Sequence, residues 1–181
     1  MSIIEIYNTH CCGEIGDVIV AGDIQLEGET IFEQSKYLFE NKKLRNFVLN
    51  EPRGGVFKHC NLIVSAKNKD ASAGFIIMEP EDNPPMSGSN SICVATVLLE
   101  KNLIKSNEPF TNFILEAPGG LISIKAEVKN KITKSVEIEN LSSFVDLLDA
   151  KLKTQSFGEI IVSTVFGLSL IHISEPTRPT L

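Results

Sequence analysis

The sequence predicts an α+β domain that consists mostly of β-sheet with two long helices. Short apolar stretches bounded by glycine or proline recur along the chain, which is typical of strands. Only residues 30–49 and 92–99 have the spacing or the density of apolar side chains that indicates a helix. Strands and helices do not alternate regularly, and no glycine-rich phosphate-binding motif follows a predicted strand. These observations disfavour a doubly wound nucleotide-binding sheet.

The first predicted elements are a hairpin and an amphipathic helix. Residues 4–7 alternate apolar and polar side chains and lead as a strand toward His10. Residues 17–21 form a second short strand, so the two strands together suggest a hairpin. Residues 30–49 repeat apolar side chains near helical spacing without glycine or proline, and we expect one helix that ends before Pro52.

The rest of the chain continues as sheet around a second helix. Residues 92–99 are almost wholly apolar, so this helix should lie inside the domain, wrapped by other elements. Further strands are predicted at residues 60–67, 73–80, 113–117, 121–130, 134–140 and 158–166.

Composition and charge limit the classes of partner. The 181 residues are 43% hydrophobic and carry a formal net charge of -6, which fits one globular domain or a little more. No basic stripe indicates a nucleic-acid surface. No apolar run reaches the roughly 18 residues of a membrane span, and the N-terminus lacks the order of a secretory signal. We therefore expect a cytoplasmic protein that binds neither nucleic acid nor a membrane.

Cysteine usage fits the same compartment. The chain has four cysteines, namely Cys11, Cys12, Cys60 and Cys93. A chain of this size can stabilise itself by burial, so free thiols are favoured over a disulfide framework. The alternative is a zinc site that joins His10 and His59 to the cysteines beside them. Adjacent cysteines fit the usual ligand spacing poorly, and we predict no metal site.

The last residues differ in style from the rest of the chain. The segment LSLIHISEPTRPTL, residues 168–181, resembles the translation of a sequencing-library adapter. We leave it out of the fold prediction and expect the native sequence to be interrupted near Gly167. The alternative is a native polar tail.

The stretch PPMSGSNSICVATVLLEK, which starts at Pro84, predicts a binding site at a helix N-terminus. The first turn of a helix leaves backbone N–H groups without partners, and the macrodipole places partial positive charge there. Small residues such as Gly88 and Ser89 let a ligand approach this backbone, which suits a carboxylate or a phosphate. The simpler alternative is that a serine or Asn90 only caps the helix.

Several long stretches resemble the proline racemase family, which includes 4-hydroxyproline 2-epimerases and trans-3-hydroxyproline dehydratases. They are EPRGGVFKHCNLIV from residue 51, AGFIIMEPEDNPPMSGSNSICVATVLLE from residue 73, and LEAPGGL from residue 115. In addition, HCCGEIGDVIVAG from residue 10 stands where family members carry a His-x-x-Gly-Glu motif. The resemblance covers about residues 3–167.

The resemblance implies a fold similar to that of diaminopimelate epimerase. That fold has two related α+β domains, each a mixed, mostly antiparallel sheet curled around a central helix, with the substrate between them. Residues 1–167 would be the first, N-terminal domain of such a protein, and residues 92–99 would belong to its central helix. The second domain would lie beyond the point where the adapter-like segment begins.

The resemblance also implies the chemistry. A cofactor-independent epimerase or racemase would remove the α-proton of 4-hydroxyproline or proline and return a proton on the opposite face. Ser87 would be one acid/base group, and Gly88, Ser89 and Asn90 would bind the substrate carboxylate. His10, in the His-x-x-Gly-Glu motif, is a further predicted substrate-binding residue.

The site departs from the pattern of many family members, whose motif is Met-Cys-Gly-His. Here the motif is MSGSN, with Ser87 at the cysteine position and Ser89 at the histidine position. A serine hydroxyl is a far weaker acid than a thiol, so Ser87 needs help to act as a base. Cys93 is no replacement, because it lies nearly two helical turns beyond Ser87. The chain resembles a subgroup of the family that has serine at this position and pairs that serine with a cysteine from the second domain. We therefore expect the 181-residue chain alone to be inactive.

Two alternatives stay open. A dehydratase of 3-hydroxyproline would use the same fold and the same α-proton abstraction, and the second-domain residue that separates the two activities is missing. A non-catalytic protein that binds an imino acid through its carboxylate is possible if serine abolishes the acid/base chemistry. The resemblance allows a homodimer, which no residue pattern here requires.

Overall fold

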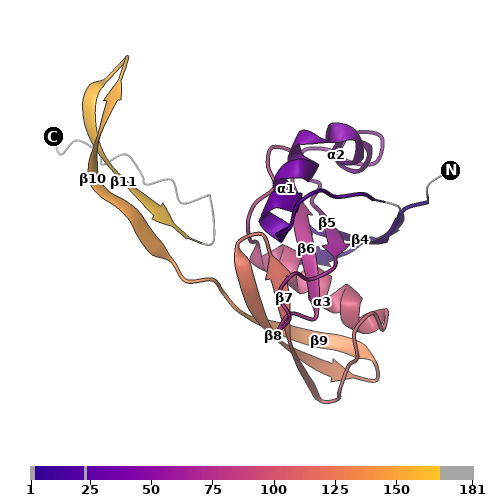
Figure 1. The fold of residues 1–181 in the computed structure, drawn as a ribbon. Helices are drawn as coiled ribbons and strands as arrows, with labels where there is room; N and C mark the ends of the chain where they lie inside the picture. Colours follow the sequence, from indigo (N-terminus) through magenta and orange to yellow (C-terminus); the bar gives the residue numbers. More distant parts are fainter. Residues whose placement is uncertain (1–2, 23, 168–181) are drawn as a thin grey trace. The chain divides into compact units, whose positions relative to one another are not determined.

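The computed structural model describes residues 3–22 and 24–167. They fall into two compact units, one that ends at Asn140 and one that begins at Leu141, and each unit is described by itself. The first unit holds a seven-stranded sheet, a short hairpin and three helices within the described residues (Figure 1). The second unit is a two-stranded hairpin.

The large sheet of the first unit is mixed. Its strands are β1 (Glu5–Tyr7), β4 (Asp17–Ala21), β5 (Cys60–Val64), β6 (Ala73–Met78), β7 (Phe110–Ala117), β8 (Gly120–Lys129) and β9 (Ile132–Glu139), in that spatial order. The β4–β5 and β6–β7 pairs are parallel, and the other four pairs are antiparallel. The predicted mixed, mostly antiparallel sheet is therefore confirmed.

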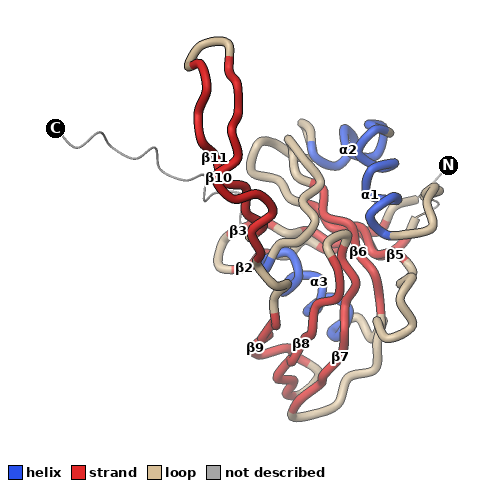
Figure 2. The backbone as a smooth tube through the Cα atoms, turned by 60° about the vertical axis from the view of Figure 1, so that its left-hand side comes forward, coloured by secondary structure: helices blue, strands red, loops and turns tan. Residues whose placement is uncertain are grey.

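Helices cover both faces of this sheet. The helices are α1 (Ile31–Glu40), α2 (Lys42–Leu49) and α3 (Gly88–Glu100). Gly74 of β6 faces α1, because a Cβ atom placed there would collide with Ile31. In Figure 2, α3 lies within the curve of the sheet, on the face away from α1 and α2. Every residue of β6 is buried, as expected for a strand covered on both sides.

The predicted pairing of the first two strands is confirmed, but their connection is not a simple turn. Strand β1 pairs antiparallel with β4, and the chain between them forms a small hairpin of β2 (His10–Cys11) and β3 (Glu14–Ile15). Cys12 and Gly13 form its two-residue turn, with φ values of 52° and 95°. Positive φ at both positions is the geometry of a tight hairpin turn.

The prediction of one helix over residues 30–49 is wrong, because the helix breaks at Asn41. Thr30 caps α1 in a capping box with Glu33, and Asn41 ends α1 and precedes α2 with φ -82° and ψ 82°. A straight continuation of the buried stripe of α1 would carry Lys42 toward the core. The break leaves Lys42 exposed and buries Arg45 instead.

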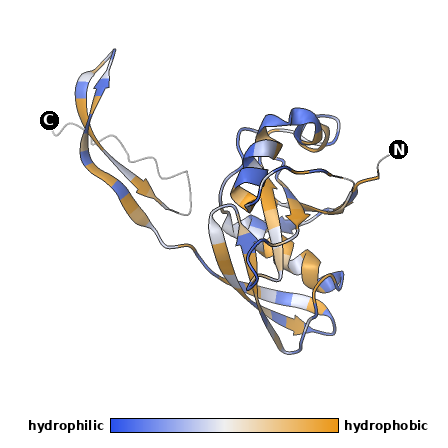
Figure 3. Cartoon of the chain, viewed as in Figure 1, coloured by the Kyte–Doolittle hydropathy of each residue, from blue (hydrophilic) through white to orange (hydrophobic). Residues whose placement is uncertain are grey.

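The second unit contains one strand that the sequence prediction missed. Strand β10 (Phe144–Thr154) pairs antiparallel with the expected β11 (Gly158–Phe166). The register of this pair shifts twice, and Asp149 adopts φ 52°, so the apolar side chains of β10 do not alternate regularly. No residue of either strand is buried, and Figure 3 shows hydrophobic residues along both.

Two further predictions concern membrane-spanning helices and the C-terminal segment. No helix in the described part of the chain is long and apolar enough to cross a membrane. Residues 168–181, where we expect an adapter-derived segment, lie outside the described residues.

Candidate active site

The first turn of α3 carries the predicted catalytic group. Ser87 is the N-cap, with extended backbone at φ -150° and ψ 131°, and its side chain accepts a hydrogen bond from the Asn90 N–H. Gly88 and Ser89 are the first two residues of the helix, so their N–H groups have no acceptor within it. Both are half-buried, which keeps them within reach of a ligand. The capping role is therefore compatible with the predicted binding role at this turn.

Ser87, Ser89 and Asn90, which we call the serine cluster, are joined by side-chain hydrogen bonds. The Asn90 Nδ2 donates to Ser87 Oγ over 3.0 Å, and the Asn90 backbone N–H donates to the same oxygen over 3.4 Å. The hydroxyl oxygens of Ser87 and Ser89 are 3.2 Å apart. The structure thus brings these three predicted site residues together.

Asn90 is placed differently from its two neighbours. Its residue is fully buried, and its Oδ1 accepts from Nδ2 of Asn61 in β5 over 2.8 Å. Both ends of the Asn90 amide are therefore bonded within the protein. The predicted role of Asn90 in substrate binding is untested, and its contacts suit the positioning of Ser87 better than a direct contact with a ligand.

Sequence reasoning missed Asn61. It is fully buried at the second position of β5, where its Nδ2 also lies 3.2 Å from the Gly16 carbonyl and 3.3 Å from that of Asp17. The signal was an amide side chain inside the apolar run CNLIV, since a buried amide requires partners.

Two of the four cysteines, Cys60 and Cys93, are buried thiols. Cys93 is 2% exposed, and burial raises the pKa of its thiol, which a hydrogen bond with Thr9 partly offsets. Burial likewise raises the pKa of the Cys60 thiol to about 12. All four cysteines are free, and within the described residues no histidine, cysteine and carboxylate groups gather as a metal site.

His10 and Glu14 lie on the small hairpin of β2 and β3. His10 is exposed, and its Nδ1 accepts from the Gly13 N–H over 3.3 Å. Within the described part of the chain, no hydrogen bond joins His10 to the serine cluster, so its place in the site stays a prediction. Glu14 instead approaches His59, whose Nδ1 lies 3.5 Å from Glu14 Oε1 and 3.6 Å from Glu79 Oε1. Burial raises the pKa of the Glu79 carboxyl, which the neighbouring imidazole partly counters.

Arg45 of α2 holds the loop that leads into the serine cluster. Its guanidinium donates to the carbonyl oxygens of Glu79 over 2.8 Å and Asp82 over 3.3 Å, and also to Asn83 Oδ1. The residue is 6% exposed, and burial lowers the pKa of its guanidinium. This clamp fixes the chain a few residues before Ser87, and the sequence alone gave no sign of it.

The electrostatics of the first turn suit an anion. The first turn of α3 contains no acidic residue. The N–H groups of Gly88 and Ser89 and the helix macrodipole therefore favour a negative ligand such as a carboxylate. Since the apolar body of α3 is buried behind this turn, the positive end of the helix is rigidly held.

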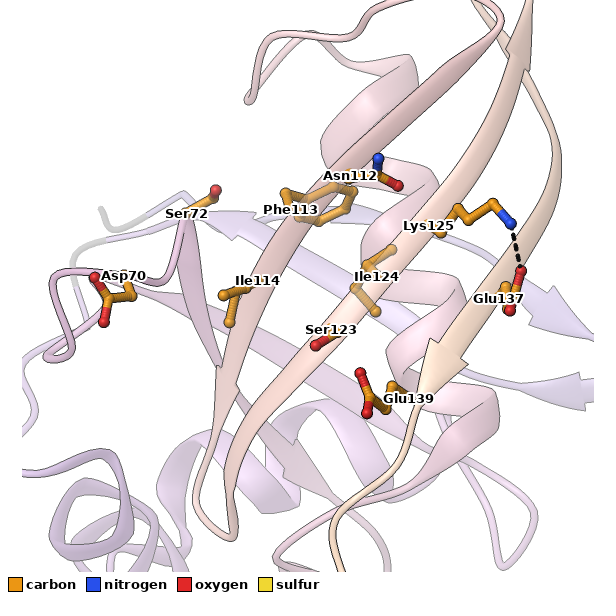
Figure 4. A pocket seen from close by; sticks show the side chains of 10 residues that line it. All are labelled: Asp70, Ser72, Asn112, Phe113, Ile114, Ser123, Ile124, Lys125, Glu137 and Glu139. Carbon is orange, nitrogen blue, oxygen red and sulfur yellow. Dashed lines mark hydrogen bonds and ion pairs between the residues drawn. The ribbon is translucent and has the colours of Figure 1, made fainter.

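A separate hollow of about 640 Å³ lies over β7, β8 and β9 (Figure 4). Its polar lining includes Asp70 and Glu139, and Lys125 and Glu137, which are cross-strand neighbours, form an ion pair of 3.0 Å within it. It contains no member of the serine cluster, and the alternation of β8 places Lys125 on the face away from α3.

A family model described as proline racemase matches residues 6–178. The chain belongs to the proline racemase family. This match agrees with the motifs around Ser87 and with the sheet wrapped around α3.

Solved structures support the same assignment. A hydroxyproline epimerase from Agrobacterium vitis, with bound trans-4-OH-L-proline, is 38% identical with a TM-score of 0.78, over 90% of this chain and 48% of that chain. A probable proline racemase from Agrobacterium radiobacter K84, with bound carbonate, is 36% identical with a TM-score of 0.78, over 90% and 49%. A methylitaconate-delta-isomerase at 15% identity and a TM-score of 0.50, over 90% and 50%, shares the fold alone. The chain spans about half the length of these proteins.

Proposed function

We propose that this chain provides the first half of the active site of a cofactor-independent amino-acid epimerase. In the proposed reaction, the α-proton of 4-hydroxyproline or proline leaves on one face of the substrate, and a proton returns on the other. Ser87 is one of the two acid/base groups. The first turn of α3 binds the substrate carboxylate through the N–H groups of Gly88 and Ser89.

The observation that carries this proposal is the position of Ser87 at the N-terminus of α3, where the first turn has no acidic residue. An α-proton next to a carboxylate is very weakly acidic, so the site must stabilise the charge that develops on the carboxylate. The N-terminus of α3 supplies that stabilisation, and Ser87 lies at the same turn with its oxygen bonded by Asn90. The relative from Agrobacterium vitis, with its bound hydroxyproline, supports this class of substrate.

The second acid/base group requires a second domain, and we propose that residues 1–167 form the first of two. The chain matches about half of each similar structure. The hairpin of β10 and β11 exposes large apolar side chains, among them Leu148 at 73% and Ile161 at 69%, which is unusual for a complete unit. These residues suit a strand pair that other elements cover in the two-domain protein.

The test is α-proton exchange in D₂O, followed by NMR, with the two-domain protein and trans-4-hydroxy-L-proline or L-proline. We expect deuterium at the α-carbon together with the opposite epimer. Ser87→Ala should lower the rate at least about 100-fold, the usual contribution of one acid/base group. Ser91→Ala is the matched control, because Ser91 lies in the same turn and, within the described residues, its side chain bonds only to the Ser87 carbonyl.

The other outcomes separate the alternatives. Loss of water from 3-hydroxyproline without epimer formation would establish the dehydratase. Binding of pyrrole-2-carboxylate, a planar mimic of the deprotonated substrate, without any exchange would establish a non-catalytic binding protein. An active Ser87→Ala variant would contradict the role of Ser87. The 181-residue chain alone should be inactive.

A further inference from the structure

Asn61 is bonded in a way that its position in the core does not require. It is fully buried, and its Nδ2 faces three acceptors, namely the carbonyl oxygens of Gly16 and Asp17 and the Oδ1 of Asn90. An amide nitrogen has only two hydrogens to offer. At the other end, the Asn61 Oδ1 is buried without a hydrogen-bond partner within the described residues. An apolar residue would fill this strand position without that cost.

The surroundings of Asn61 fix the orientation of its amide. Backbone carbonyls only accept hydrogen bonds, so Gly16 and Asp17 require the nitrogen end of the Asn61 amide to face them. The same nitrogen then faces Asn90, which must present Oδ1. Once Asn90 turns its Oδ1 toward Asn61, the Nδ2 of Asn90 faces Ser87 Oγ, 3.0 Å away.

The orientation therefore passes along the chain of side chains to the serine hydroxyl. Ser87 Oγ accepts from the Nδ2 and the backbone N–H of Asn90. These two bonds occupy both lone pairs, so the hydroxyl hydrogen points elsewhere, toward Ser89 Oγ at 3.2 Å or toward a ligand. After loss of that hydrogen, the oxygen keeps two donors and can accept a third hydrogen bond from the Ser89 hydroxyl.

We propose that Asn61 is a positioning residue that, through Asn90, makes Ser87 Oγ an obligate acceptor and stabilises its deprotonated form. This is the help that a serine needs to act as an acid/base group. The assignment of Ser87 as that group rests on the proposed function. The hydrogen-bond polarity itself does not, and it can be measured without a substrate.

The test replaces Ser87 by a group whose ionisation is easy to follow. In the 181-residue chain, Ser87→Cys introduces a thiol, and its pKa follows from the pH dependence of iodoacetamide alkylation at that peptide, read by mass spectrometry. Donors aimed at the sulfur stabilise the thiolate, so we expect a pKa below the ordinary cysteine value of about 8.5.

A second substitution in that background isolates Asn61. Asn61→Leu keeps the size of the side chain but removes the donor that orients Asn90. We expect the thiol pKa to rise by about one unit and the alkylation rate at pH 7 to fall about tenfold, because a hydrogen bond to a charged group is lost. Ser91→Ala, which removes a buried hydrogen bond of 2.6 Å from the same turn, should leave both values unchanged.

Every outcome bears on the proposal. The proposal is overturned if Asn61→Leu leaves the thiol pKa of the Ser87→Cys variant unchanged. It is also overturned if Ser91→Ala raises that pKa as much as Asn61→Leu does. If Asn61→Leu does not fold, as judged by circular dichroism, the side-chain amide signals of the unsubstituted chain decide. The Asn90 Nδ2 signal must shift on Ser87→Ala, and an unchanged signal overturns the proposal. If the Ser87→Cys variant shows the expected thiol pKa but the two-domain protein does not exchange the α-proton, only the proposed function is contradicted.

Discussion

Gly16, which directly precedes β4, packs against the first turns of α3. A Cβ atom at this position would stand 2.8 Å from Cys93 Sγ and 3.0 Å from Asn90 Oδ1. The Gly16 carbonyl also accepts from Thr9 Oγ1 over 2.6 Å and from Asn61 over 3.2 Å. The absence of a side chain thus lets β4 and its bonded neighbours pack directly against the serine cluster.

Gly16→Ala should therefore destabilise the fold. We expect a loss of about 1–3 kcal/mol in the free energy of unfolding, measured by urea denaturation, because the added methyl overpacks a tight contact. The control is Gly88→Ala, where the nearest atom to an added Cβ is the flexible tip of Ile138 at 3.3 Å. That change should stay within about 1 kcal/mol. Equal losses in the two variants would show that the contact at Gly16 is not tight.

Local sequence predicted candidate site residues at the first turn of α3, but it did not predict the buried Asn61 that bonds to them. Ser87, Gly88 and Ser89 were predicted, because small residues before an apolar helix are a local pattern. Asn61 lies 29 residues from Asn90 along the chain, and only the pairing of β4 with β5 brings its amide into the cluster. Contacts that depend on tertiary structure leave little trace in local sequence.

Among the elements, α2 matters to the site through Arg45. The loop of residues 79–83 has several carbonyl oxygens aimed at one buried guanidinium. Loss of that donor removes the guanidinium from the carbonyl oxygens of Glu79 and Pro80, whereas the Asp82 carbonyl keeps a bond of 2.8 Å from the Glu79 N–H. The loop leads directly to Pro84 and Ser87, so its position controls the start of α3.

Arg45→Met should lower the free energy of unfolding by about 3 kcal/mol, and it should speed amide hydrogen exchange in residues 79–86. Arg53→Met is the matched control. Arg53 is exposed and contacts the Phe47 ring at 4.0 Å, so its loss should cost at most about 1 kcal/mol. If the two variants lose the same stability, the clamp by Arg45 is not what orders the loop.

The capping box of α1 predicts a pH dependence. Hydrogen bonds from the backbone of Thr30 and Glu29 lower the pKa of the Glu33 carboxyl. A lowered pKa in the folded state adds stability above the ordinary glutamate pKa of about 4.3, and this is lost as the pH falls through the lowered value. Glu33→Gln should therefore reduce the loss of stability with falling pH in this acid range. The measurement is thermal unfolding between about pH 2.5 and pH 6. An unchanged acid slope would contradict the cap.

The sequence predicted elements well where a pattern was local and regular. The apolar run of α3 and the strand β8 after its Pro-Gly-Gly turn were both predicted from the sequence. The break at Asn41 was not predicted, because it depends on which helix face meets the sheet. The strand β10 was not predicted, because its pairing contains register shifts. The curled shape of the sheet came from resemblance, since periodicity does not encode curvature.

For the whole molecule, the two units should differ in stability. A two-stranded hairpin without a buried residue is marginal in water, whereas β5 and β6 lie in the core. In the 181-residue chain, hydrogen exchange followed by mass spectrometry should show rapid exchange in β10 and β11 and slow exchange in β5 and β6. Equal protection of both units would mean that the hairpin is stabilised by contacts beyond its own two strands.

The most direct test of the central claim is whether the first turn of α3 binds a carboxylate. We would titrate the ¹⁵N-labelled chain with pyrrole-2-carboxylate and follow the backbone amide signals by NMR, with pyrrole-2-carboxamide as the neutral control. The predicted result is a saturable shift centred on the N–H groups of Gly88 and Ser89 with the carboxylate only. The claim is contradicted if the carboxamide gives the same shifts, or if the carboxylate shifts other residues and leaves this turn unchanged.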